Sequence, residues 1–415
     1  MRTYERTHPW LTFELRLDRA DADVWLLLGE AQSKCEHVAG VPLKPSTAQR
    51  VHMLYLAKGV RATTAIEGNT LSEQQVMDHL EGKLELPKSK AYLQQEIANI
   101  VNACNSISNE SLKEPRALSP ERISQFNAMV LDKLELEDHI RPGKVRTYEV
   151  GVGTYRAAPH QDCKYLLDRM CEWLNGRSFT PDNPTPDRLI VFAILKAVLA
   201  HLYLAWIHPF GDGNGRTARL VEFEILIGAG VPTPCAHLLS DFYNDTRTEY
   251  YRQLDYASKS GGDVIPFLMY ALQGLVDGLR NQVGVIRDQQ WHVAWVNYVH
   301  EQFKGPESET DRRQKHLVLD LSETNDEPKS ILQLPRVSAR VAEAYASKGR
   351  RTLTRDIVVL ERKQLIVRSG NGYTANRHAI LAFLPRRARP PSPASLPAID
   401  GPSENEGPSP PTTGV

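Results

Sequence analysis

Apolar residues recur at helical spacing through most of the first 300 positions. Residues three or four apart lie on one face of an α-helix, so this period predicts amphipathic helices. Ser119-Pro120-Glu121 adds a helix start, and Gly228 to Gly230 a helix end. We therefore expect a mainly α protein with helices over 22–35, 51–66, 92–107, 160–176, 189–207, 246–258 and 264–283.

Residues 145–159 interrupt the helical pattern. Pro142-Gly143 is a turn signal, and β-forming residues such as Val145 and Tyr155 surround two glycines. This composition predicts a β-hairpin inserted in the helical domain.

The run from Leu189 to Ile207 is apolar and long enough to cross a bilayer. Lys196 stands in its middle, however, and a central lysine costs roughly 2.5–3.5 kcal/mol in a membrane. We therefore predict a buried central helix and no membrane partner.

The pattern changes after residue 305. Short helical stretches at 311–321, 330–334, 337–347 and 352–363 precede a predicted hairpin at 365–373, with its tip at 370–372. Helices followed by a hairpin are the layout of a winged helix, expected over 305–385. The tail at 386–415 is rich in Pro, Ser, Gly and Glu, which predicts disorder.

Charge is unevenly distributed in a chain whose formal net charge is zero. Arg336 to Arg389 holds 13 basic and only three acidic residues. Such a concentration is typical of nucleic-acid binding, so DNA is a candidate partner. Internal packing and protein binding remain alternative roles for this region.

The five cysteines form no Cys-x-x-Cys pair, and the first residues contain no apolar signal segment. These features argue against a disulfide framework or a zinc site. We therefore expect a cytoplasmic protein. The cysteines are Cys35, Cys104, Cys163, Cys171 and Cys235.

The run His208-Pro-Phe-Gly-Asp-Gly-Asn-Gly-Arg-Thr-Ala-Arg219 combines several groups suited to phosphate chemistry. Glycines at alternate positions let backbone N–H groups converge on an anion at a helix start. Arg216 and Arg219 share one helix face, Asp212 offers an oxygen ligand for Mg²⁺, and His208 can accept a proton. The run is neither a Walker A loop nor a Rossmann fingerprint. A glycine-rich turn between two helices is the plain alternative.

This run resembles the complete Fic signature, His-x-Phe-x-Asp/Glu-Gly-Asn-Gly-Arg-x-x-Arg, with no departure. The resemblance extends directly over about 45–270 and loosely over 305–385. It implies a helical Fic core with a β-hairpin flap, and transfer of AMP from Mg·ATP to a Ser, Thr or Tyr hydroxyl of a protein. The implied division is an N-terminal helical region (1–110), a Fic catalytic domain (111–285), a winged-helix domain (305–385) and a disordered tail (386–415).

The resemblance also implies a role for each residue of the signature. His208 would act as the base, Asp212 would hold Mg²⁺, and Phe210 would anchor the loop in the core. Five further residues would bind the phosphates of ATP: Gly213, Asn214, Gly215, Arg216 and Arg219.

Flanking segments resemble other parts of a Fic site. The hairpin would be the flap that aligns the target chain, with Val152, Gly153, Thr154 and Tyr155 nearest the nucleotide. Tyr250 and Ser258 would close the adenine pocket. Plain helix packing is the alternative for Tyr250.

Thr63-Thr-Ala-Ile-Glu67-Gly-Asn resembles the family's inhibitory motif, carried here on a helix at about 51–67. Glu67 would pair with Arg219 and take the place of the γ-phosphate, with Thr63 beside it. A solvated glutamate or a helix-capping turn are the alternatives. The same carboxylate could instead orient a water that removes AMP from protein.

The sequence therefore favours a self-inhibited protein adenylyltransferase, a nucleotidyltransferase acting on an unknown protein and on itself. One alternative is a DNA-binding transcriptional regulator whose Fic domain senses nucleotide. The intact His208 argues against it, because a pure binding site needs no base. A toxin-like Fic enzyme, a donor such as UTP and a homodimer also stay open.

Overall fold

We describe the protein from a computed structural model, over residues 2–111, 117–153, 155–305, 308–324 and 326–381. The chain divides into two compact units, Met1–Gln290 and Trp291–Val415. Thr154 and the tail predicted to be disordered lie outside the described residues.

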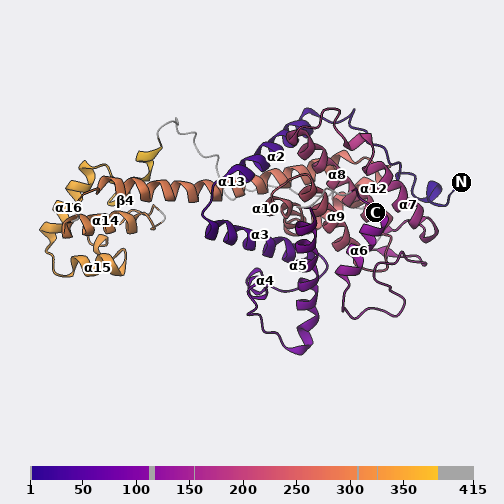
Figure 1. The fold of residues 1–415 in the computed structure, drawn as a ribbon, viewed down its shortest axis with the longest axis horizontal. Coiled ribbons are helices and arrows are strands. Elements are labelled where there is room, and N and C mark those ends of the chain that lie inside the picture. The colour runs from indigo at the N-terminus through magenta and orange to yellow at the C-terminus, as the bar shows by residue number, and fades with distance from the viewer. Residues whose placement is uncertain (1, 112–116, 154, 306–307, 325, 382–415) are drawn as a thin grey trace, which may run out of the picture. The chain divides into compact units, whose positions relative to one another are not determined.

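The first unit is helical, which confirms the mainly α prediction (Figure 1). Its buried apolar residues form one cluster that runs from Leu11 to Leu279, so the N-terminal helices share a core with those that follow. The helices are α1 (Tyr4–Thr7), α2 (Ala22–Gly40), α3 (Pro45–Ala65), α4 (Glu73–Leu80), α5 (Ala91–Ser111), α6 (Pro120–Val130), α7 (His160–Leu174), α8 (Pro186–Ile207), α9 (Asn214–Gly228), α10 (Thr233–Ala236), α11 (Leu238–Asp245), α12 (Arg247–Lys259) and α13 (Ile265–Gln302), with 3₁₀ turns at Lys88–Lys90 and Arg177–Phe179.

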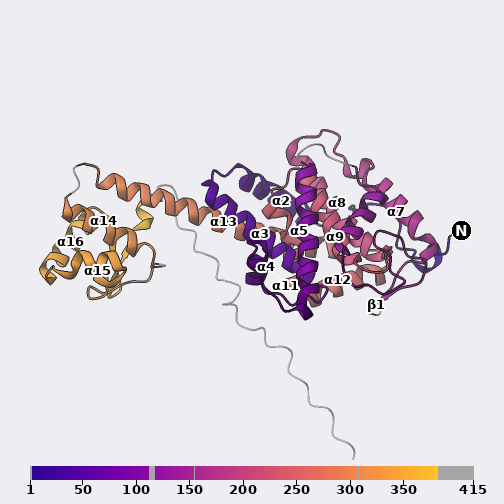
Figure 2. The same cartoon turned by 60° about the horizontal axis from the view of Figure 1, so that its bottom comes forward.

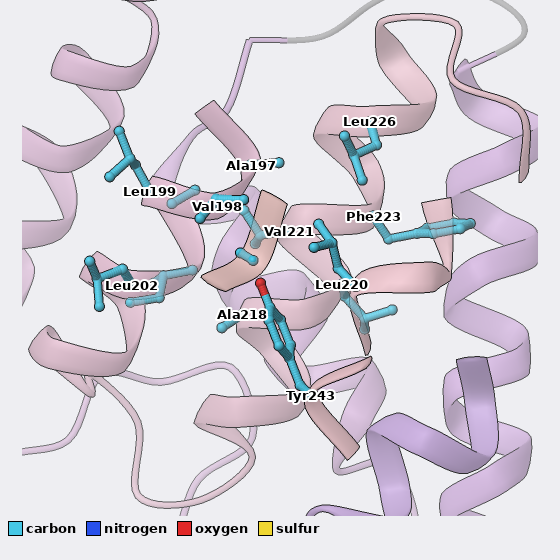
Figure 3. Packing of buried hydrophobic residues seen from close by; sticks show 14 of the residues in the cluster. Ala197, Val198, Leu199, Leu202, Ala218, Leu220, Val221, Phe223, Leu226 and Tyr243 are labelled. Atoms are coloured by element: carbon cyan, nitrogen blue, oxygen red, sulfur yellow. The ribbon is translucent and has the colours of Figure 1, made fainter. Parts of the chain in front are cut away.

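Helix α8 lies at the centre of this unit and packs along α9. Apolar side chains from the two helices meet, and Tyr243 of α11 reaches in between them (Figure 3). By length and composition α8 passes a test for a membrane span, with a mean hydropathy of 2.1, but 72% of that apolar window is buried in the protein. The amine of Lys196 reaches the side-chain oxygen of Asn175 at 3.1 Å. The prediction of a buried core helix is therefore confirmed.

Helices α5 and α6 both pack against α9, and α3 contacts α5 and α9 (Figure 2 shows α3, α5 and α9). Helix α3 also packs on α10 and α11. The end of α3 is thereby brought beside the start of α9, which positions the site described below.

The predicted hairpin over 145–159 is wrong in its extent. Only Gly151–Val152 (β1) and Tyr155–Arg156 (β2) pair, antiparallel. The residues on either side of these strands are held by Arg146 instead. Its guanidinium donates to the carbonyls of Tyr148 and Ala158. Side-chain hydrogen bonds thus take the place of a longer strand ladder.

Helix α13 was predicted to end at 283 but continues to Gln302. The residue that follows, Gly284, costs an α-helix only about 1 kcal/mol. Beyond it, Trp295 and Val299 are fully buried in the core of the second unit, which offsets that cost. The sequence analysis also missed α4, although Ser72 and Gln75 form a capping box at its start.

The second unit, after the end of α13, shows the predicted order of helices followed by a hairpin. The stretch at 330–334 is an exception: a turn leads into a 3₁₀ helix there, and no α-helix forms. A bridge between Lys329 and Tyr373 adds a third segment to the hairpin. The winged-helix assignment stays a prediction. The elements are α14 (Glu309–Leu321), a 3₁₀ turn (Leu334–Arg336), α15 (Ala339–Ala346), α16 (Arg350–Arg362), β3 (Ile366–Ser369), β4 (Gly372–Ala375) and a 3₁₀ turn (Arg377–Ile380).

Candidate active site

The loop between α8 and α9 is held by its own side chains. His208 ends α8 in the left-handed region at φ 49°, and Gly213 precedes α9 at φ 75°. The side chain of Asn214 accepts a hydrogen bond from the backbone N–H of Phe210 and donates one to its carbonyl, both at 2.9 Å. Phe210 is buried, as predicted. Asn214 therefore shapes the loop with its side chain.

Helix α6 braces the same loop through Asn127. Its amide nitrogen donates to the carbonyl of Asp212 at 2.8 Å, and its oxygen accepts from the N–H of Gly143 at 2.9 Å. A Cβ on Gly213 would lie 3.1 Å from that amide nitrogen, and the positive φ also favours glycine there. The sequence analysis did not find Asn127.

Arg146 fixes His208 from the other side. Its buried guanidinium donates to the carbonyl of His208 at 2.8 Å, and its backbone N–H donates to the carbonyl of Pro209 at 2.9 Å. This arginine was also missed, because it is separated in sequence from the motif it supports.

His208 is a neutral imidazole at physiological pH. Burial lowers its pKa to about 4, and the positive charge of Arg146 acts in the same direction. Glu67 and Asp212 oppose this shift only in part. A neutral ring can accept a proton, so the lowered pKa suits His208 to the role of general base.

A pocket of about 390 Å³ opens beside His208. Most of the predicted residues meet there, although they come from the turn after α3, the β1–β2 hairpin, the α8–α9 loop, α9 and α12. The lining comprises Ile66, Glu67, Val152, Gly153, Tyr155, Ala205, Trp206, His208, Gly215, Arg219, Tyr250, Tyr251, Leu254 and Asp255.

The structure places Ser258 outside this pocket, and its assignment to the adenine site stays a prediction. Its hydroxyl donates to the carbonyl of Asp255 at 2.9 Å, and the residue lines a separate hollow. One turn earlier on α12, Leu254 and Asp255 line the pocket instead. Gly213, Asn214 and Arg216 are not part of the lining either.

Tyr250 both lines the pocket and packs within the helical core. Its position is therefore compatible with a role in the adenine pocket and with plain helix packing. Its hydroxyl lies 2.8 Å from Nε2 of His201, and its ring stacks on Tyr243 at 4.9 Å between centroids. Glu222 accepts a hydrogen bond from the Tyr243 hydroxyl at 3.0 Å and lies 3.4 Å from Nδ1 of His201.

The expected pair between Glu67 and Arg219 is present. Nη2 of Arg219 lies 2.6 Å from Oε1 of Glu67, and Nε donates to the hydroxyl of Thr63 at 2.6 Å. Burial raises the pKa of Glu67, but Arg219 outweighs burial and holds that pKa below its usual value. A Cβ on Gly215 would stand 2.3 Å from Oε1 of Glu67, so glycine makes room for the carboxylate.

A second carboxylate, on Glu96 of α5, binds the other arginine of the motif. Nη1 of Arg216 donates to Oε1 of Glu96 at 3.0 Å, and Nη2 lies 3.5 Å from Oδ1 of Asp212. Two buried nitrogens, Nη1 of Arg219 and Nε of Arg216, have no hydrogen-bond partner. Unpaired cationic donors of this kind suit an anionic ligand.

Asp212 fits a magnesium site shared with a ligand. Its side chain is 44% exposed, and Oδ1 accepts the N–H of Gly213 at 2.5 Å. Within the described ranges, no group of three or more His, Cys, Asp or Glu could hold a metal. Mg²⁺ often takes only one or two carboxylates and completes its shell with phosphate oxygens and water, which Asp212 permits.

Comparison with known proteins agrees with this geometry. Residues 117–226, which contain the loop together with Asn127 and Arg146, match the Fic/DOC family. These residues form a Fic domain. Glu67 and Glu96 precede the matched Fic residues, and Tyr250 follows them.

Relatives of known activity resemble the Fic domain and its surroundings. The protein adenylyltransferase fic-1 of Caenorhabditis briggsae is 32% identical over 258 residues, which are 60% of this chain and 46% of that protein. The Nematostella vectensis protein adenylyltransferase Fic is 26% identical over 247 residues. The chain thus spans about half the length of these relatives.

A solved structure of C. elegans Fic-1, residues 134–508, superposes with a TM-score of 0.50 at 27% identity, over 64% of this chain and 73% of that one. A Fic family protein from Desulfovibrio desulfuricans G20 gives a TM-score of 0.52 at 21% identity, over 86% of this chain and 96% of that one. The second likeness shows the fold alone.

Proposed function

We propose that this protein is an adenylyltransferase that moves AMP from Mg·ATP to a hydroxyl of a protein. The observation that carries the proposal is the neutral His208, which lines the same pocket as Arg219. The names of the relatives support the same reaction.

In the proposed reaction, the hydroxyl oxygen of the target attacks the α-phosphorus of ATP. A new P–O bond forms, the bond from the α-phosphorus to the bridging oxygen breaks, and pyrophosphate leaves. His208 takes the hydroxyl proton. Arg216 and Arg219 stabilise the negative charge on the departing pyrophosphate, and Asp212 would hold Mg²⁺, which supplies charge neutralisation across the phosphates when bound.

The Glu67 carboxylate supports a self-inhibited enzyme. It lines the pocket and pairs with Arg219, an arginine that ATP would need. An anion in this position repels phosphate and occupies its donors. The same carboxylate, near the Arg219 side of the pocket, could alternatively orient a water for removal of AMP.

The test is intact mass spectrometry of Glu67→Gly after incubation with Mg·ATP. We expect a gain of one AMP that is weak in the wild type and absent in Glu67→Gly/His208→Ala. Glu85→Gly is the matched control, because Glu85 is exposed and outside the pocket. No more modification in Glu67→Gly than in the wild type would contradict self-inhibition. Modification by Mg·UTP but not by Mg·ATP would contradict the donor.

A second experiment separates addition from removal of AMP. Modified Glu67→Gly protein is offered to fresh wild-type protein and to fresh Glu67→Gly protein without ATP. Release of AMP by the wild type alone supports hydrolysis that depends on Glu67. Retention of AMP with both contradicts it.

A second candidate function is DNA binding through α16. Arg351, Arg355 and Arg362 are exposed and recur with Val358 along one face of the helix. No ion pair joins these arginines to an acid in the described part of the chain, whereas the buried Asp356 pairs with Arg313. An unpaired arginine stripe suits the phosphate backbone of a nucleic acid.

The test is fluorescence anisotropy with duplex DNA at two salt concentrations. Replacing the three arginines with alanine should weaken binding and reduce the slope of log K against log salt by about 3. Replacing Arg6, Arg19 and Arg177, three exposed arginines of the first unit, is the control. Equal binding by both triple variants, or none at low salt, would contradict this function.

We also propose a cytoplasmic location, because all five cysteines are buried free thiols, as suits a reducing compartment. A homodimer stays a prediction.

A further inference from the structure

The Glu96 carboxylate connects Arg216 of the signature run to Asn69 in the turn after α3. Its Oε1 accepts from Nη1 of Arg216 at 3.0 Å, and its Oε2 accepts from the amide nitrogen of Asn69 at 2.8 Å. Each carboxylate oxygen therefore has its own donor. The Glu96 side chain is 17% exposed and that of Arg216 is 6% exposed, so the ion pair is largely withdrawn from water.

The two carboxylates near the motif arginines occupy different places. Glu67 is part of the pocket lining, whereas Glu96 and Arg216 are not. Glu96 therefore lies outside the pocket that Glu67 lines. It binds Nη1 of the Arg216 guanidinium, and Nη2 of that arginine lies 3.5 Å from Oδ1 of Asp212.

Asn69 connects Glu96 to the segment that carries Glu67. The buried Asn69 amide also donates to the carbonyl of Leu93 at 3.0 Å, and its oxygen accepts from the N–H of Leu71 at 3.0 Å. Asn69 follows Glu67 by two residues, across Gly68 at φ 104°. These bonds fix the turn after α3 onto α5.

We propose that Glu96 is a positioning residue that sets Arg216 for the β- and γ-phosphates of the nucleotide. Through Asn69, the same carboxylate anchors the turn that presents Glu67 to Arg219. The inference rests on the proposed function, since it assigns Arg216 to a triphosphate. The Glu96 side chain thereby positions both Arg216 and the turn that carries Glu67.

A neutral amide cannot replace this carboxylate. Gln at position 96 has one acceptor oxygen, but both neighbours, Arg216 and Asn69, are donors. One of them loses its partner whichever way the amide turns. A buried arginine without its counter-ion is free to leave its orientation.

The test measures binding of Mg·ATP and of AMP by calorimetry, in Glu67→Gly/His208→Ala and in the same protein with Glu96→Gln added, since loss of the His208 base prevents turnover. We expect Mg·ATP binding to weaken about tenfold or more, as for loss of one charge-assisted hydrogen bond, with AMP binding unchanged. AMP is the internal control, because it lacks the phosphates assigned to Arg216. Glu96→Asp, which keeps the charge, should restore part of the affinity, and Glu85→Gln should have no effect.

Equal weakening of ATP and AMP would overturn the positioning role, since it would indicate general damage to the pocket. Tighter ATP binding in Glu96→Gln would make Glu96 a second competitor, which also overturns it. Binding is measured without turnover, so these outcomes are distinct from a failure of AMP transfer.

Asn69→Ala tests the anchoring of the turn. In the otherwise wild-type protein it should raise self-modification, because Glu67 is held less firmly. In Glu67→Gly the same substitution should leave modification unchanged. An equal effect in both backgrounds would overturn the link between Asn69 and Glu67.

Discussion

At the scale of single residues, the chemistry of His208 depends on the groups that surround it. His208 directly follows the apolar helix α8, and Arg146 is hydrogen-bonded to its carbonyl. Both effects disfavour the protonated form, since burial penalises the charge and the guanidinium repels it. His208 thus stays a free base in conditions where an exposed histidine would be partly protonated.

We predict that the activity of Glu67→Gly changes little between pH 6 and 8 and declines only as the pH approaches 4. The pKa of His208 is about 4, so its base form is lost only in that acid range. The measurement is a pH profile of kcat/KM for self-modification, beside an NMR titration of the His208 ring. His208→Ala identifies the resonance. A ring that titrates near 6.5 would contradict the prediction.

The sequence revealed those site residues that lie close together in the chain. His208, Asp212 and Arg219 belong to one run and lie at one site, and Glu67 was found through a second motif. Asn127 and Glu96 stand alone in ordinary helical segments, and nothing in their local pattern marks them. Only the packing of α5 and α6 on α9 brings them to the loop.

At the scale of elements, close helix packing depends on small residues at the contact points. A Cβ on Gly274 of α13 would lie 2.1 Å from a ring carbon of Phe242 on α11. Gly284 of the same helix has nothing within 4 Å of an added Cβ. Gly274 permits the close approach of α11 to α13, whereas Gly284 lies at no close contact and has no such role.

We predict opposite effects for alanine at these two positions. Gly274→Ala should lower the free energy of unfolding by about 1–3 kcal/mol, since Phe242 must shift in a packed core. Gly284→Ala should leave it unchanged or raise it by up to about 1 kcal/mol, because alanine is the better helix former. Urea denaturation followed by circular dichroism measures both. Similar midpoints for the two variants would show that the α11–α13 contact is not tight.

Local pattern predicted which elements exist better than where they end. The continuation of α13 past Gly284 depends on the burial of later residues in the core of the second unit. The local sequence around Gly284 carries no information about that burial. The hairpin is shorter than predicted for a comparable reason. The β-forming residues near Val145 indicated strands, but Arg146 supplies the backbone carbonyls with donors from a side chain.

At the scale of the whole molecule, the first unit contains several histidines that the fold keeps neutral. Burial lowers the pKa of His8, His79, His208 and His237. In the unfolded chain each would titrate near 6.5. Below that pH the unfolded state binds protons that the folded state does not, so acid favours unfolding.

We predict that the first unit becomes less stable as the pH falls from 7 to 5. Each depressed histidine contributes at most about 1.4 kcal/mol per pH unit below its unfolded pKa. Hydrogen-exchange mass spectrometry at the two pH values, corrected for intrinsic exchange, should show loss of protection in α8–α10. His208→Gln should reduce the loss. Unchanged protection at pH 5 would contradict the assignment of these histidines as neutral.

The double hydrogen bond between Asn214 and the backbone of Phe210 closes a small ring within the loop, independent of any ligand. A loop already locked in this shape is preorganised, so an arriving triphosphate need not supply the entropy of ordering it. Structural change on nucleotide capture should then be confined to the turn that carries Glu67, while 208–215 superposes between the empty and filled forms. Regulation would act by moving Glu67 away from Arg219, and the loop at 208–215 would not need to change its structure.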